Sequence, residues 1–321
     1  MKLALFRTSP INQKTIVKSK DFLTLCDLDR EEICSILNLT VDIKSNPERY
    51  AGALKGKGLA MIFEKPSLRT RVSFDVGIHQ LGGFSICLLP SDISLGKRES
   101  VHDVAKNLER MVNGIMIRTF AHKIAVDLAA SSAIPVINGL TDYSHPCQAM
   151  ADIFTIRERK GKLPGLKLCF VGDGNNVAHS LMFAGARLGV NVTVACPLGY
   201  EPDEIAFRHA REYAKRTNAR IEVTHDPVEG VLAADVVYTD VWASMGQESE
   251  AAKRNAIFRP FQINTSLMKH AKPDAIFMHC LPAHRGDEVT DEVIDSPASV
   301  VFQEAENRLH VQKAIMVELM R

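Results

Sequence analysis

Five short polar segments of the chain carry residue types that could bind an anion and act on a small molecule. The first, residues 63–71, has the sequence FEKPSLRTR and stands between an apolar run and a helix-like stretch. A helix beginning near Ser67 would point unpaired N–H groups and its positive dipole end at an anion. Ser67 and Thr70 add hydroxyl donors, and Arg69 adds a planar guanidinium that suits phosphate. The segment predicts a phosphate site, and the alternative is a plain helix cap with exposed arginines.

The second segment, residues 141–148, has the sequence TDYSHPCQ and also follows an apolar run. Pro146 fixes the turn and suits the first position of a helix. His145 and Gln148 are then three residues apart and could face one ligand. An imidazole can donate to a carbonyl oxygen, and an amide oxygen can accept from an NH2 group. The alternative is an ordinary helix cap.

The third segment, residues 171–176, has the sequence VGDGNN and invites comparison with a dinucleotide-binding turn. That fingerprint needs a third glycine, but Val177 stands there, and the next strand ends in Cys196 and Pro197 rather than in an acid for a ribose. A nicotinamide site is therefore disfavoured. Asn175 and Asn176 would still present polar groups at the sheet edge.

The fourth segment, residues 240–246, has the sequence DVWASMG and contains the single tryptophan of the chain. An acid at the end of a strand, here Asp240, can pair with a substrate ammonium group. The alternatives are a helix cap or a packed surface loop.

The fifth segment, residues 278–286, has the sequence MHCLPAHRG. Cys280 could be a catalytic thiol, a zinc ligand or an inert buried cysteine. The spacing of His279, Cys280 and His284 matches no established zinc motif, so a metal is the least favoured of the three.

Strand-like and helix-like runs alternate along the chain and must position these segments. Apolar runs predict strands at 59–64, 84–89, 114–118, 134–138, 167–171, 191–196, 220–224, 235–239 and 275–278. Helices are predicted from near Asp29 with a capping pair to Glu32, and at 101–112, 123–132, 177–188, 203–217 and 305–320. Such alternation favours an α/β fold with two mainly parallel sheets flanked by helices. Each segment follows a strand, and ligands bind beyond the carboxyl ends of such strands.

The length and composition favour two globular domains with a reduced interior. A chain of 321 residues suggests two domains, and the charged stretch 157–165, ending in Pro164 and Gly165, predicts a turn into the second. Seven cysteines without a CxxC pair indicate reduced thiols and a cytoplasmic location. The first 20 residues hold five basic side chains and no acid, as a targeting peptide would, but their poor amphipathic face favours a short disordered arm.

The charge and hydropathy of the chain argue against two classes of partner. A formal net charge of +1 gives no long-range attraction to nucleic acid or to an anionic membrane. No apolar run approaches the roughly 20 residues needed to span a bilayer. An anionic substrate would therefore need a local basic cluster.

Taken in order, the five segments resemble the aspartate and ornithine carbamoyltransferase family over essentially the whole chain, and its ornithine-specific members most closely. The resemblance implies a carbamoyl phosphate-binding domain at 1–150, an ornithine-binding domain at 151–304 and a C-terminal helix, 305–321, packing back on the first domain. It implies a homotrimer with active sites at subunit interfaces, and neither a metal nor a cofactor. The implied reaction moves the carbamoyl group of carbamoyl phosphate to the side-chain amine of ornithine, giving citrulline and phosphate in arginine metabolism.

The resemblance also implies roles for residues that match the family's motifs by position. The implied catalytic residues are Arg69, His145 and Cys280. Carbamoyl phosphate would be bound by Ser67, Leu68, Arg69, Thr70, Arg118, His145, Gln148, Cys280, Leu281 and Arg308. Ornithine would be bound by Asn176, Asp240, Ser244 and Met245.

Two positions depart from the family pattern. Leu68 stands where the family usually has threonine, so one hydroxyl is lost, although the backbone N–H at 68 could still serve the phosphate. Ser94 lies in the loop 92–100, which in the family reaches a neighbouring active site, and some relatives have glutamine or histidine there.

Other interpretations keep part of this chemistry. The acceptor could be putrescine, acetylornithine or aspartate, and the chain could be a non-catalytic homologue. Asp240 followed by the SMG sequence at 244–246, together with HCLP at 279–282, favours free ornithine. The presence of Arg69, His145, Gln148 and Cys280 argues against loss of catalysis.

Overall fold

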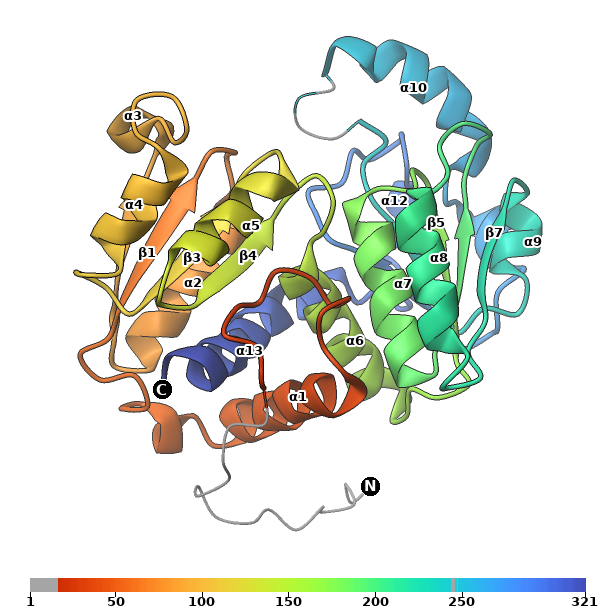
Figure 1. The fold of residues 1–321 in the computed structure, drawn as a ribbon. Coiled ribbons are helices and arrows are strands. Elements are labelled where there is room, and N and C mark those ends of the chain that lie inside the picture. The colour runs from red at the N-terminus through yellow and green to blue at the C-terminus, as the bar shows by residue number, and fades with distance from the viewer. Residues whose placement is uncertain (1–16, 244–245, 247) are drawn as a thin grey trace.

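The computed structural model describes residues 17–243, 246 and 248–321, which form two lobes, each a parallel sheet flanked by helices (Figure 1). The first sheet has the strand order β2-β1-β3-β4, and every neighbouring pair is parallel. Its strands are β1 (Gly58–Phe63), β2 (Phe84–Leu88), β3 (Gly114–Arg118) and β4 (Val136–Leu140). The helical elements of this part of the chain are α1 (Arg30–Ser45), η1 (Pro47–Tyr50), α2 (Leu68–Gln80), α3 (Pro90–Ile93), α4 (Val101–Leu108), α5 (His122–Ser131) and α6 (Pro146–Lys160).

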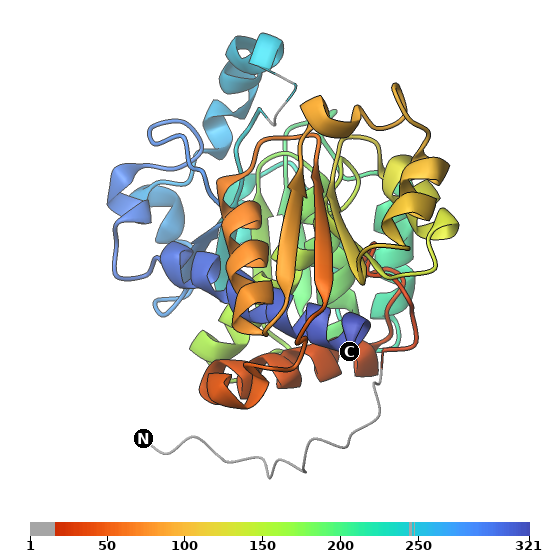
Figure 2. The same cartoon turned by 90° about the vertical axis from the view of Figure 1, so that its left-hand side faces the viewer.

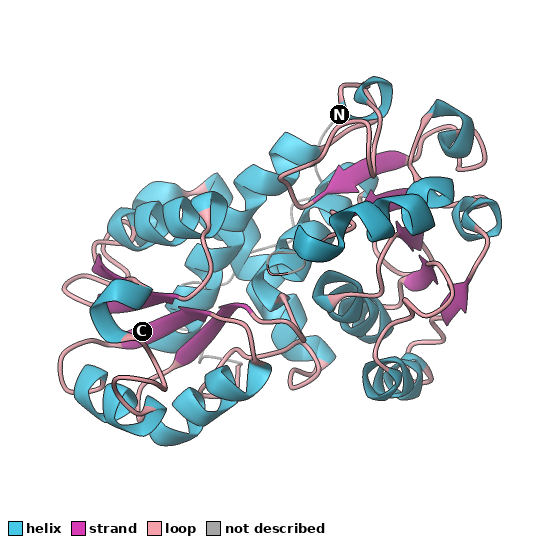
Figure 3. Ribbon diagram, turned by 90° about the horizontal axis from the view of Figure 1, so that it is seen from above, coloured by secondary structure: helices cyan, strands magenta, loops and turns pink. Residues whose placement is uncertain are grey.

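The second sheet is also parallel throughout, with the order β7-β6-β5-β8-β9. Its strands are β5 (Lys167–Val171), β6 (Asn191–Ala195), β7 (Ile221–Thr224), β8 (Val236–Thr239) and β9 (Ile276–His279). The helical elements here are α7 (Asn176–Leu188), α8 (Glu204–Ala214), α9 (Pro227–Val231), η2 (Glu248–Glu250), α10 (Ala251–Phe258), η3 (Arg259–Phe261), α11 (Thr265–Met268), α12 (Asp291–Ile294) and α13 (Val301–Met320). Viewed from above, the two sheets lie side by side as separate layers (Figure 3). The expected α/β architecture is confirmed.

Apolar strand sequences explain why the sheets lie inside the lobes. β1 and β8 are buried along their whole length. Strands covered by helices on both faces are apolar at consecutive positions rather than at alternate ones. The same property made these strands recognisable in the sequence, and the predicted bounds agree with most strands to within one or two residues.

Three long helices, α1, α6 and α13, support the region between the sheets. The C-terminal helix α13 packs against α6, α1 and α2 and also contacts β9. Figure 2 shows α13 in blue crossing behind the first sheet to the C-terminus. One apolar core runs continuously from β1 through α6 and α13 to α7 and β5. The loops at the edges of both sheets are therefore supported by the same apolar core.

Local capping signals in the sequence are confirmed where helices begin. Asp29 caps α1, and its capping box with Glu32 is complete. Ser67 caps α2 by accepting a hydrogen bond from the backbone N–H of Thr70. Asn175 caps α7 by accepting from the N–H groups of Val177 and Ala178. Because these side chains satisfy N–H groups that a helix start leaves unpaired, they fix where each helix begins.

Two predicted boundaries are wrong. Residues 157–160 do not form a turn but the last helical turn of α6, which ends at Gly161 in the left-handed conformation (φ 74°). The helix continues because Glu158 is bound by Lys44 and Asn307 from distant parts of the chain. α13 begins at Val301, four residues before the predicted start at 305. The predicted domain limit at 150–151 lies within α6, and the domain limits stay a prediction.

Within the described residues, no helix combines the length and the apolar character that crossing a membrane requires. The predicted N-terminal arm lies mostly outside the described residues and stays a prediction.

Candidate active site

The loops at the carboxyl ends of the two sheets meet through hydrogen bonds between the lobes. The Asn176 side chain donates from Nδ2 to the carbonyl oxygen of Thr141 over 2.6 Å. On the next turn of α7, Ser180 Oγ accepts from the backbone N–H of His145 over 2.9 Å. The start of α7 is therefore fixed to the loop that follows β4. This contact brings the predicted carbamoyl phosphate and ornithine segments together.

The first segment forms the N-terminus of α2 as predicted. Ser67 is the cap, and the backbone N–H of Thr70 donates to its Oγ over 3.2 Å. The Leu68 side chain is 72% exposed and takes no part in this turn. The threonine-to-leucine departure therefore leaves the helix N-terminus intact, because the backbone N–H groups that an anion would use are unaffected.

Arginine side chains from two elements contact Thr70, and the charge of Arg69 lies close to them. Arg308 of α13 donates from Nη2 to Thr70 Oγ1 over 2.6 Å, and Arg118, the last residue of β3, donates to the same oxygen over 3.5 Å. Burial and repulsion from Arg308 and Arg69 lower the pKa of Arg118 to about 10. Three cations held this close in a buried place repel one another, and an anion would relieve that repulsion.

His145 and Gln148 lie at the start of α6, where Pro146 is the first helical residue as predicted, and both side chains are buried. Burial, with the nearby charges of Arg308 and Arg118, lowers the pKa of His145 well below its ordinary value. The imidazole is therefore neutral at physiological pH. Among the described residues, His145 Nδ1 and Gln148 Oε1 have no hydrogen-bond partner although both are buried. Buried polar atoms without partners are uncommon, so these two are candidates for substrate contacts.

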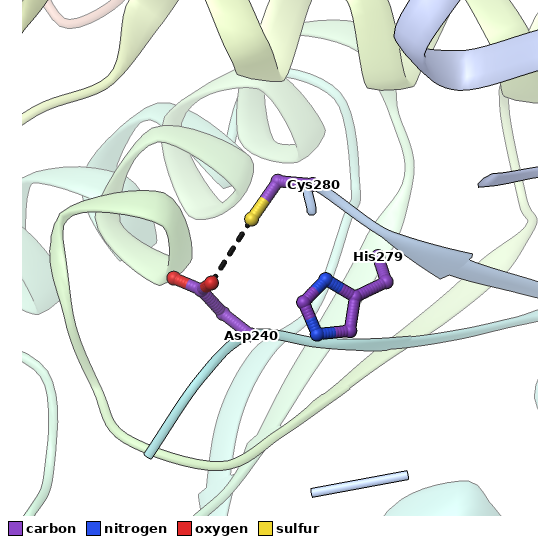
Figure 4. Close-up of side chains that lie close together, drawn as sticks. All are labelled: Asp240, His279 and Cys280. Atoms are coloured by element: carbon purple, nitrogen blue, oxygen red, sulfur yellow. Dashed lines mark hydrogen bonds between the residues drawn. The ribbon is translucent and has the colours of Figure 1, made fainter. Parts of the chain in front are cut away.

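Asp240 and Cys280 form the opposite side of the site. The Cys280 thiol donates to Asp240 Oδ1 over 3.0 Å, and Asn175 donates from Nδ2 to Oδ2 over 2.9 Å. Figure 4 shows the thiol pointing at the carboxylate. Burial, followed by the charge of Asp240, raises the pKa of Cys280 well above its ordinary value. The thiol is therefore a neutral hydrogen-bond donor, not a thiolate poised to attack.

The predicted phosphate and amino-acid sides are electrostatically coupled. Burial lowers the pKa of Arg69, while Cys280 and Asp240 act in the opposite direction. Arg69 is thus close enough to the second lobe to interact electrostatically with its charged groups. Arg118 interacts with the same two groups, so both arginines lie within electrostatic reach of the amino-acid side.

Asp240, His279 and Cys280 place potential metal-ligand atoms within 4.8 Å of one another (Figure 4). However, His279 Nδ1 accepts from the backbone N–H of Leu281 over 2.9 Å, and Nε2 lies 3.2 Å from Glu288 Oε1. Both ring nitrogens are therefore engaged. The donor set fits a hydrogen-bonded cluster better than a metal centre.

The remaining predicted site residues come after β8 and β9 along the chain. Leu281 follows Cys280 with a positive φ of 56° and packs on the apolar core behind the second sheet. Ser244 and Met245 lie outside the described residues, so their predicted role is not described by the structure.

Sequence reasoning missed three buried residues near the site: Lys65, Asp152 and Glu304. Lys65 Nζ lies 4.2 Å from the centre of the Phe120 ring and pairs with Asp142. Its position within the FEKPSLRTR segment could have indicated it. Asp152 lies one helical turn after Gln148, and Glu304 one turn before Arg308. The separation of 152 residues between these two acids gave no signal of their contact.

Comparison with known proteins agrees with this arrangement. Residues 20–158 match the sequence model described as the carbamoyl-P binding domain of aspartate/ornithine carbamoyltransferase. Residues 164–319 match the corresponding Asp/Orn binding domain. The match covers both lobes, and the chain belongs to the aspartate/ornithine carbamoyltransferase family.

Individual relatives cover nearly the whole chain. An ornithine carbamoyltransferase from Thermococcus kodakarensis is 58% identical over 306 residues, which are 94% of this chain and 96% of that protein. A relative from Pyrococcus furiosus named "ornithine carbamoyltransferase, anabolic" is 55% identical over 94% of this chain and 96% of its own length. A solved structure of ornithine carbamoyltransferase from Pyrococcus furiosus superposes with a TM-score of 0.91 at 55% identity, covering 94% and 96% of the two chains.

Proposed function

We propose that this enzyme transfers the carbamoyl group of carbamoyl phosphate to the side-chain amine of L-ornithine, giving L-citrulline and phosphate. One observation carries the proposal. Arg69, Arg118 and Arg308 gather at the N-terminus of α2, and Arg69 and Arg118 interact electrostatically with the Asp240–Cys280 pair. One side suits a phosphate and the other an ammonium group. The anabolic name of the Pyrococcus furiosus relative favours the citrulline-forming direction and a place in arginine biosynthesis.

The phosphate side would both bind the substrate and stabilise its leaving group. Arg69, Arg118, Arg308 and the N–H groups at the start of α2 neutralise the charge that grows on phosphate as the C–O bond breaks. Neutral His145 and Arg69 can donate to the carbonyl oxygen, where charge develops in the tetrahedral transition state. Gln148 Oε1 can accept from the carbamoyl NH2 group.

The ornithine side would select which amine reacts. Asp240 binds the α-ammonium group and keeps it away from the carbonyl carbon, while the neutral δ-amine attacks. The proton released from that amine goes to the departing phosphate, since the Cys280 thiol is already protonated. Holding both substrates in line removes up to roughly 7–11 kcal/mol of the barrier, and no covalent enzyme intermediate is needed.

The first prediction is that purified enzyme forms citrulline from ornithine and carbamoyl phosphate without added metal or nucleotide. Activity should rise with pH because the attacking amine must lose its proton. A colorimetric citrulline assay with ornithine, acetylornithine, putrescine and aspartate as acceptors checks this. Faster turnover with another acceptor contradicts the choice of substrate, and complete loss of activity in a chelator contradicts the mechanism.

We also propose that the enzyme is a homotrimer whose neighbouring subunits share active sites. Exposed apolar side chains lie on one stripe of α2, from the phosphate loop onward, and on the edge strand β2. They are Leu68, Val72, Val76, Phe84 and Ile86. A contiguous exposed apolar surface commonly marks a protein interface. The loop 94–100, in which residues 96–98 are exposed and Leu95 is buried, follows β2 along the chain.

The second prediction tests the shared site by complementation. A variant lacking the exposed residues 96–98 and an Arg69→Ala variant should each be inactive alone. Mixed trimers should regain part of the wild-type activity, because some interfaces pair an intact loop with an intact Arg69. Subunit exchange is verified by native mass spectrometry, and a mixture of two differently tagged Arg69→Ala proteins is the control. If mixed trimers form and stay inactive, the shared site is excluded.

A further inference from the structure

The amide of Gln148 is held by two buried carboxyl groups from different helices. Its Nε2 donates to Asp152 Oδ1 over 2.8 Å and to Glu304 Oε1 over 3.0 Å. Both amide hydrogens are therefore used, and both partners are acceptors. This fixes which way the amide points, because the reverse orientation would place its oxygen against two acceptors. The Oε1 atom then faces away from the acids, without a partner among the described residues.

The two acids receive different numbers of hydrogen bonds. Glu304 accepts on both oxygens: Oε1 also accepts from the Tyr238 hydroxyl over 3.1 Å, and Oε2 from the backbone N–H of His279 over 3.0 Å. Within the described residues, Asp152 Oδ2 has no donor. Glu304 is therefore suited to be the carboxylate, and Asp152 Oδ2 is suited to carry a proton.

Asp152 and Glu304 are buried without a cation paired directly to them among the described residues, and this favours a proton on one of the two carboxyl groups. Asp152 and Glu304 are fully buried, and no ion pair to either occurs in the described part of the chain. Burial raises the pKa of both carboxyl groups, and because Glu304 accepts three hydrogen bonds and Asp152 one, Asp152 is the acid that takes the proton. Two adjacent buried carboxylates cannot both be ionised without large repulsion.

We propose that Asp152 and Glu304 together hold one proton, carried by Asp152, and are positioning residues, which hold the Gln148 amide with its oxygen toward the carbamoyl group. This inference rests on the proposed function, in which that oxygen accepts from the carbamoyl NH2. A freely flipping amide would present its own NH2 to the substrate NH2 for part of the time. The pair also joins α6 to α13 and to the second sheet, so the orientation depends on the packing of both lobes.

The third prediction compares two substitutions of similar size at one position. Asp152→Asn keeps an acceptor for Gln148 and mimics a protonated acid, so KM for carbamoyl phosphate should stay within about twofold of wild type. Asp152→Leu removes the acceptor, so KM should rise by about tenfold and kcat should fall. A role in packing alone would make Asp152→Leu the better tolerated substitution. Thermal unfolding of both variants separates loss of folding from loss of positioning.

A double-mutant cycle shows whether Asp152 acts through Gln148. In a Gln148→Ala background the amide is gone, so Asp152→Leu should have little further effect on KM or kcat. Effects that simply add would overturn the proposal. Citrulline formation by the wild-type enzyme in the same assay checks the proposed function independently. If the wild-type enzyme forms citrulline but the effects of Asp152→Leu and Gln148→Ala add, the proposed role of the carboxyl pair is wrong and the proposed function still stands.

Glu304→Gln tests the same proposal if the Asp152→Leu variant does not fold. A glutamine there must turn its NH2 toward either the His279 N–H or the Gln148 NH2, so its effect should exceed that of Asp152→Asn by about tenfold. Tyr238→Phe is the matched control, since it removes one donor from Glu304 but leaves the acceptors of Gln148 in place. Equal behaviour of Glu304→Gln and Asp152→Asn would overturn the assignment of the proton to Asp152.

Discussion

Replacing Arg69 with alanine is expected to reduce kcat/KM on the order of 10²- to 10³-fold while leaving the fold intact. The residue is half-buried at the start of α2 and faces the charges of the second lobe rather than the apolar core. In the proposed mechanism its guanidinium acts on both the phosphate and the carbonyl oxygen. Arg69→Lys should recover only part of the activity, because an ammonium cannot reproduce a two-pronged contact. Steady-state kinetics with varied carbamoyl phosphate measure the effect.

Arg71→Ala is the matched control for this prediction. It removes the same charge two residues away, from an exposed side chain that belongs to none of the site contacts described above. Its kcat/KM should stay within about threefold of wild type, since scattered surface charges contribute little. Near-normal turnover by Arg69→Ala at moderate carbamoyl phosphate would place the phosphate site elsewhere. Circular dichroism and thermal unfolding verify that both variants fold.

Much of the fold could be predicted because its central strands are buried on both faces. Where consecutive apolar residues stand between turn signals, as in β5 (Lys167–Val171), the first and last residues of the strand can be predicted closely. The end of α6 was mispredicted because the charged residues 157–160 look like a surface turn in isolation. Their helical state depends on contacts of Glu158 with Lys44 and Asn307, which are far away in the sequence. Local pattern cannot supply such tertiary support.

The candidate site could be predicted where its chemistry is local. The cap at Ser67 and the pair His145 and Gln148 each lie within a few residues, so spacing alone places them on one helix start. Ionisation states depend on neighbours from other elements and could not be predicted. The sequence left open whether Cys280 is a catalytic thiol, a zinc ligand or a buried cysteine, and only the structure shows that burial and Asp240 raise its pKa well above its ordinary value.

Asp240→Asn should weaken the use of ornithine on the order of 10²-fold while leaving carbamoyl phosphate binding nearly unchanged. The Asp240 carboxylate is held by Asn175 and Cys280, and the carbamoyl phosphate side has its own cations on α2, β3 and α13. An asparagine keeps the shape but loses the charge that would bind the α-ammonium group. The loss should therefore appear in KM for ornithine and in kcat. Kinetics with varied ornithine, and calorimetry with carbamoyl phosphate alone, separate the two effects.

Cys280→Ser changes the partner of Asp240 rather than Asp240 itself, so its effect on the use of ornithine should be smaller than that of Asp240→Asn. A serine hydroxyl can donate to Asp240 Oδ1 as the neutral thiol does, so the carboxylate keeps its orientation. The pKa of the thiol is already too high for it to ionise near neutral pH, so little is lost on that account. Cys280→Ala removes the donor, and its effect on ornithine should fall between those of Cys280→Ser and Asp240→Asn. If Asp240→Asn or Cys280→Ser impairs carbamoyl phosphate binding as severely as Arg69→Ala does, the division of labour between the two lobes is mistaken.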